Sequence, residues 1–165
     1  MSFGFMGCNP KQIWPATPAV GEPKPPPYGT RGQAKGKTYI LLQAGENLGR
    51  RALVVVQSSH FEANQTQMPN NSGALVALVE NETGDVPSGS RFWGLIEGCD
   101  VEVRVRPNAS DVSPGGGPFT VHNSGALINS GGNTTNKING IFLRAKTNGS
   151  TFELCDLWNP KGVCE

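Results

Sequence analysis

The sequence of 165 residues lacks a long hydrophobic run, and its longest clean apolar stretch covers only residues 74–79. A membrane-spanning helix needs about 18 or more apolar residues, so we expect no membrane span. The first residues carry neither a basic segment nor a continuous apolar segment, and we therefore expect no secretory signal. Charged residues make up only 16% and the formal net charge is +1. This balance gives no overall attraction to nucleic acid or to an anionic membrane.

Cysteine is scarce and its spacing is not that of a metal site. The four cysteines, Cys8, Cys99, Cys155 and Cys164, form no Cys-x-x-Cys pair, which argues against structural zinc. Cys155 and Cys164 are close enough in sequence to form a bridge, but without a sign of secretion we favour free thiols. We expect no metal and no cofactor.

Catalytic motifs are also missing. Histidine occurs only as His60 and His122. A triad of His122 with a serine and an acid such as Asp111 can be drawn, but no Gly-x-Ser-x-Gly nucleophile elbow supports it. The glycine clusters at 115–117 and 131–132 are not followed by the Lys-Ser/Thr of a phosphate-binding loop. We therefore expect that the protein is not an enzyme.

From residue 38 onward the chain consists of short apolar segments separated by turn residues. Residues 101–106 alternate strictly, which is typical of a strand with one buried face. No stretch combines a helical period with helix caps. This predicts an all-β domain over residues 38–165, built as a small β-barrel or β-sandwich. The expected strands lie at residues 38–43, 52–57, 74–79, 91–96, 101–106, 119–122, 140–144 and 151–158.

The same pattern predicts part of the core. Phe119, Ile141 and Leu143 lie in the expected strands and are predicted to be buried. Phe92 and Trp93 are adjacent in one strand and therefore point to opposite faces, so at least one of them is expected in the core.

Residues 1–37 differ in composition from the rest. They contain seven of the 13 prolines and carry a net charge of +4, against −3 for the remaining chain. Proline fixes φ and cannot donate to a β-ladder, so we expect an extended arm beside a β-domain that folds without it. The arm nevertheless carries large apolar side chains, which a solvating linker lacks. We therefore expect the arm to dock onto its own domain or onto a partner.

One ordered set of features indicates a family. An aromatic-bearing strand at 39–43 leads through a Gly-containing turn to an Ala-Leu-Val-Val-Val strand. Later come Pro-Ser-Gly-Ser-Arg-Phe-Trp-Gly at 87–94, a Val-rich alternating strand, and a late Gly-Ile-Phe-Leu strand at 140–143. Over roughly residues 38–145 this set resembles the decoration, or cement, proteins of tailed bacteriophages, which coat the outside of the capsid.

The resemblance implies a compact β-domain, jelly-roll or β-tulip-like, that gathers as a homotrimer and uses its arm to bind the major capsid protein. It also implies a protein made in the bacterial cytoplasm and located on the outer surface of the virion. No nucleic-acid or membrane partner is expected. The apolar anchors and basic residues expected to contact the capsid or a neighbouring subunit are Phe3, Phe5, Lys11, Ile13, Trp14, Lys24, Tyr28 and Arg31.

A second interpretation stays open beside the first. The chain is then the receptor- or glycan-binding head of a capsid or tail fibre, with the arm as its tether. Trp93, Trp158 and the Asn/Gly-rich loops would form the binding surface.

Overall fold

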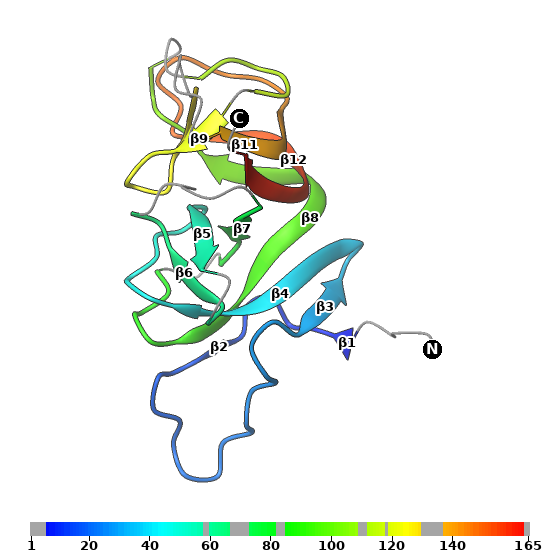
Figure 1. Ribbon diagram of the computed structural model, residues 1–165, viewed down its shortest axis with the longest axis vertical. Helices are drawn as coiled ribbons and strands as arrows, with labels where there is room; N and C mark the ends of the chain where they lie inside the picture. Colours follow the sequence, from blue (N-terminus) through cyan, green and yellow to red (C-terminus); the bar gives the residue numbers. More distant parts are fainter. Residues whose placement is uncertain are drawn as a thin grey trace.

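The computed structural model describes residues 6–57, 60–66, 73–81, 85–108, 112–117, 119–129 and 137–163. These residues form strands and turns with no helix, which confirms the predicted all-β fold (Figure 1). In chain order the strands are β1 (Met6–Gly7), β2 (Ile13–Trp14), β3 (Arg31–Ala34), β4 (Lys37–Ala44), β5 (Leu53–Gln57), β6 (Glu62–Asn64), β7 (Leu75–Val79), β8 (Arg91–Arg104), β9 (Phe119–Val121), β10 (Leu127–Asn129), β11 (Lys137–Leu143) and β12 (Phe152–Val163).

Five of these strands close into a small barrel. Around the ring, β4 pairs with β6, β6 with β5, β5 with β7, β7 with β8, and β8 with β4. All five strands contribute side chains to one buried cluster, which fills the interior of the barrel. Gly94 of β8 also lies there, where an added Cβ would be 2.6 Å from Leu42 Cδ1 and 3.0 Å from Ala77 Cβ. Only glycine fits at this position without displacing its neighbours.

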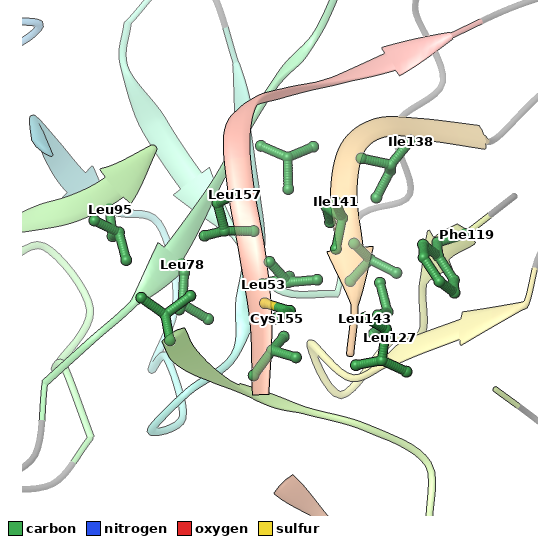
Figure 2. Packing of buried hydrophobic residues seen from close by; sticks show 14 of the residues in the cluster. Leu53, Leu78, Leu95, Phe119, Leu127, Ile138, Ile141, Leu143, Cys155 and Leu157 are labelled. Carbon is green, nitrogen blue, oxygen red and sulfur yellow. The ribbon is translucent and has the colours of Figure 1, made fainter. Parts of the chain in front are cut away.

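A second layer packs against the outside of the barrel. The last part of β8 leaves the ring and pairs with β12, which pairs with β11, and β9 and β10 follow. The outward-facing Leu53, Leu78 and Leu95 of the barrel strands share one buried cluster with Cys155 and Leu157 of this layer (Figure 2). Burial of apolar surface between the two layers is therefore the main force that holds them together.

The predicted core residues are buried in this arrangement. Phe119, Ile141 and Leu143 are each at most 2% exposed, which confirms their assignment. Phe92 and Trp93 are both buried, because one points into the barrel cluster and the other into the cluster between the layers.

Strand β8 differs from the sequence prediction, which divided it into two strands. Residues 91–104 form one strand of 14 residues with an irregularity near its middle. Opposite Cys155 lies Val101 and opposite Leu157 lies Gly98, so β8 has one extra residue there. Asp100, with φ of 53°, sits in this bulge, and its N–H donates to Asp156 Oδ1 at 3.0 Å. The bulge accommodates Asp100 as an extra residue, and the strand continues on both sides of it.

The structure also places residues of the predicted arm in the sheet. Strand β3 forms a hairpin with β4, closed by Lys35 and Gly36, which both have positive φ. Strand β1 pairs with β3, and β2 pairs with β8. The extended, unpaired part of the arm therefore lies between Trp14 and Arg31.

Candidate interaction surfaces

Trp14 fixes the start of the extended segment to the domain. It pairs with Arg91 in the β2–β8 ladder, and its ring meets Trp93 edge to face with 6.4 Å between the centroids. Trp14 is only 8% exposed, and Ile13 beside it is half-buried against the barrel cluster. Both residues therefore pack on their own domain, which is one of the two outcomes expected for the arm.

Tyr28 fixes the other end of the segment. The guanidinium carbon of Arg91 lies 4.3 Å from the centre of the Tyr28 ring, a cation–π contact. Immediately after it, the Gly29 N–H donates to the Leu41 carbonyl at 2.8 Å, which returns the chain to the sheet. Arg91 thus joins both ends, through its backbone to Trp14 and through its side chain to Tyr28.

Between these ends, residues 15–27 form a loop that we call the proline loop. It projects away from the domain at one end of the long axis of the molecule (Figure 1). Its tip is a tight turn in which the Glu22 N–H donates to the Ala19 carbonyl and the Ala19 N–H donates to Glu22 Oε2. Gly21 has φ of 93° there, and Val20 is fully exposed. The turn therefore presents one apolar side chain to solvent.

The remaining predicted arm residues are distributed as follows. Lys11, Lys24 and Arg31 are exposed. Phe3 and Phe5 lie outside the described residues. Of the eight predicted contact residues, Lys24 alone lies within the proline loop, and Trp14 and Tyr28 hold its base.

A basic cavity that the sequence did not reveal lies where the N-terminal segment crosses the β3–β4 hairpin. It has a volume of about 230 Å³, and its lining includes Lys11, Lys35, Lys37 and Glu80. Glu80 accepts hydrogen bonds from the Lys37 ammonium and from the Tyr39 hydroxyl. Burial and the Glu80 carboxylate raise the pKa of Tyr39, which therefore stays protonated and donates.

A second exposed surface lies on β11 and β12. Four large apolar side chains, which we call the apolar face, are 38–54% exposed there: Phe142, Phe152, Leu154 and Trp158. Phe142 of β11 lies opposite Asp156 of β12, and alternate residues of β12 point the same way. The four side chains therefore share one side of the sheet, although the sequence singled out Trp158 alone.

An ion cluster lies within the apolar face. Arg144 donates from Nε and Nη2 to the two Asp156 carboxylate oxygens, at 3.1 and 2.8 Å, and also pairs with Asp100. Asp156 in turn accepts the N–H of Asp100 at the β8 bulge. The Arg144 side chain holds the pKa of Asp156 below its ordinary value. The cluster therefore joins β8 and β12 to Arg144, the residue that follows β11, through charged contacts.

His122 contacts an arginine and a serine. Arg106 Nη1 lies 3.2 Å from His122 Nε2, and Ser124 Oγ lies 3.1 Å from His122 Nδ1. A guanidinium only donates, so Nε2 is the acceptor in the contact with Arg106. Asp111 lies outside the described residues.

Within the described parts of the chain, no group of three His, Cys, Asp or Glu side chains is placed to hold a metal ion. Over those same ranges no helix is long and apolar enough to cross a membrane. The described cysteines, Cys8, Cys99 and Cys155, are free thiols, and Cys164 lies outside those ranges. Comparison of the chain with protein-family models and with curated proteins gives no match.

Proposed function

We propose that this chain is a structural protein of a virus particle, a decoration protein that binds the outer surface of a tailed-phage capsid and stabilises the shell. The observation that carries the proposal is the proline loop, held at both ends through Arg91 and projecting from a compact β-domain. The resemblance of residues 38–145 to phage decoration proteins supports the same function. In this proposal the protein is made in the bacterial cytoplasm and binds as a homotrimer.

The loop has the physical properties of a binding segment. Its six prolines restrict φ, so little backbone entropy is lost when the loop meets a partner. Val20 supplies an exposed apolar contact at the tip, and Lys24 supplies a positive charge beside it. We propose that these residues, with Lys11 and Arg31, contact an acidic region of the major capsid protein. Each contact is modest, but three loops of one trimer bound to one shell act together.

The alternative function, a receptor- or glycan-binding head, is supported by one observation. A cavity of about 330 Å³ lies beside the exposed Trp158 ring and is also lined by Asn139 and Asn159. An aromatic ring beside side-chain amides suits a polar ligand with apolar patches, such as a sugar. Trp93 is buried in the core, so the part of this alternative that used it is corrected.

The test is binding of the purified protein to shells that lack it. The double variant Val20→Ser, Lys24→Glu is expected to weaken binding by roughly tenfold or more, because both changes remove loop contacts. Arg50→Glu is the matched control, since Arg50 is exposed and its replacement changes the net charge by the same amount as Lys24→Glu. Neither protein should melt at a lower temperature. Equal binding by the double variant and the control would contradict the proposed role of the loop.

A further inference from the structure

The basic cavity beside the β3–β4 hairpin combines positive charge with room for a small ion. The described residues that line it include three lysines, Lys11, Lys35 and Lys37, and one acid, Glu80. Its volume of about 230 Å³ is enough for several water molecules. Lys11 and Lys35 are exposed, so a solute can reach the cavity from the solvent.

The acid of the cavity is engaged by its neighbours. Glu80 accepts hydrogen bonds from the Lys37 ammonium and from the Tyr39 hydroxyl. Its backbone carbonyl accepts a further hydrogen bond from Arg51 Nη1 at 3.0 Å. The Lys37 and Glu80 side chains are only 23% and 16% exposed, so salt screens their interaction less than it screens a pair on the open surface. Glu80 therefore holds the Lys37 ammonium in place at the cavity.

Lys35 has a backbone conformation that lysine rarely adopts. Its φ is 51° and that of Gly36 is 74°, in the two-residue turn that joins β3 to β4. Asparagine and glycine are preferred at positions of positive φ in such turns. Side chains other than glycine in this conformation are concentrated at functional sites, including ligand contacts. The choice of lysine at this position therefore indicates a role for its ammonium group.

Lys11 is held near the hairpin by its local backbone. Its N–H donates to Asn9 Oδ1 at 3.2 Å, and the Gln12 N–H donates to the Asn9 carbonyl at 3.0 Å, so Lys11 lies in a tight turn. The Cys8 N–H donates to the Gln33 carbonyl of β3 at 3.2 Å and ties this turn to the hairpin. The backbone on both sides of the cavity is therefore fixed before a ligand binds, which reduces the entropy lost on binding.

We propose that the basic cavity is a binding site for a phosphate group. Lysine ammonium groups bind phosphate as point charges, whereas the planar carboxylate is best matched by the fork of an arginine, a residue absent from the described lining. A phosphate group carries close to two negative charges at neutral pH, and the lining supplies three ammonium groups against one carboxylate. The ligand is free inorganic phosphate or the phosphate of a larger molecule. This binding does not depend on the proposed role on a capsid.

Isothermal titration calorimetry of the full chain with inorganic phosphate, at constant ionic strength, tests the proposal. We expect saturable binding, and acetate, which carries a single charge, should bind at least about tenfold more weakly. The double variant Lys11→Gln, Lys35→Asn should raise the dissociation constant for phosphate at least about tenfold. The double variant Lys24→Gln, Lys161→Gln is the control, because it removes the same charge from two exposed lysines outside the cavity lining.

The fold of the first double variant is checked by its melting temperature, which should not fall, because both lysines are exposed and asparagine suits the positive φ of residue 35. Amide resonances of the parent chain give a readout that needs no variant. Phosphate should shift those of Lys35 and Lys37 and leave that of Lys161 unchanged.

The absence of saturable phosphate binding would overturn the proposal. Equal phosphate affinity of the two double variants, or acetate binding as tight as that of phosphate, would overturn it as well. Glycerol phosphate separates the two sources of the ligand. Binding as tight as that of inorganic phosphate would assign the site to the phosphate of a larger molecule, and much weaker binding would assign it to the free ion. These titrations contain no shells, so their result is separate from the test of capsid binding.

Discussion

At the scale of single residues, Trp14 matters because of what it covers. Its ring packs on Trp93, and the Trp93 side chain belongs to the cluster between the barrel and the second layer. A tryptophan in a proline-rich segment is equally compatible with binding to a partner and with packing on its own domain. Trp14 packs on its own domain only if β8 has an unpaired edge at Arg91. This edge is present only in the folded barrel, so the sequence does not show it.

We expect Trp14→Ala to lower the free energy of unfolding by about 3 kcal/mol, since it removes a large buried side chain and leaves a cavity. Denaturant unfolding of the full chain measures this change. Val20→Ser, which alters a fully exposed residue, should change the stability by no more than about 0.5 kcal/mol. Unchanged stability together with lost shell binding would show that Trp14 points outward in the protein.

The pair Phe92 and Trp93 shows what residue patterns predict and what they leave open. Alternation along a strand places the two side chains on opposite faces. Both are buried because this strand has the barrel interior on one side and a packed second layer on the other. A single strand carries no signal of that second layer, whose strands β9 to β12 lie at residues 119–163.

At the scale of elements, the longer strands were predictable, whereas among the shortest ones only β9 was. Strands such as β4, β5 and β7 are continuous apolar runs bounded by turn residues. Strands β1, β2 and β6 have two or three residues each, and their pairing depends on neighbours supplied by the fold. That the β-domain folds without its arm stays a prediction, and a thermal melt of a chain without residues 1–36 tests it, because Trp14 packs on Trp93.

Asp156 accepts a hydrogen bond from the β8 bulge, and we expect its contribution to the free energy of unfolding to depend on pH. Arg144, together with the Asp100 N–H, favours the charged carboxylate and lowers its pKa. A carboxyl group of this kind adds stability above its unfolded pKa, near the ordinary 3.8, and loses that contribution as the pH falls through the folded value. We expect the melting temperature to fall below about pH 4, and Asp156→Asn to be less stable at pH 7 with a flatter acid profile.

Thermal melts between pH 2 and pH 7 measure both effects. Asp85→Asn is the control, because Asp85 is an exposed carboxylate outside the cluster, and it should keep the parental profile. An Asp156→Asn variant with the same acid profile as the parent would show that the cluster does not contribute to the pH dependence of stability.

At the scale of the whole molecule, the fold separates two exposed surfaces. The proline loop projects at one end of the long axis, and β11 and β12, which carry the apolar face, lie toward the other end (Figure 1), so the chain can contact two partners at once. The proline content of the sequence indicated the loop, but no pattern in the sequence indicated the apolar face. Its four residues look like ordinary strand residues until the structure shows them 38–54% exposed on one side of β11 and β12.

The central claim is that many copies of this chain coat a viral shell. The most direct test is the copy number of the protein relative to the major capsid protein in purified particles from its source, measured by quantitative mass spectrometry. The account predicts a ratio near one, or another simple fraction set by the lattice of the shell. A handful of copies per particle would favour the receptor- or glycan-binding head, and complete absence from the particles would contradict the account.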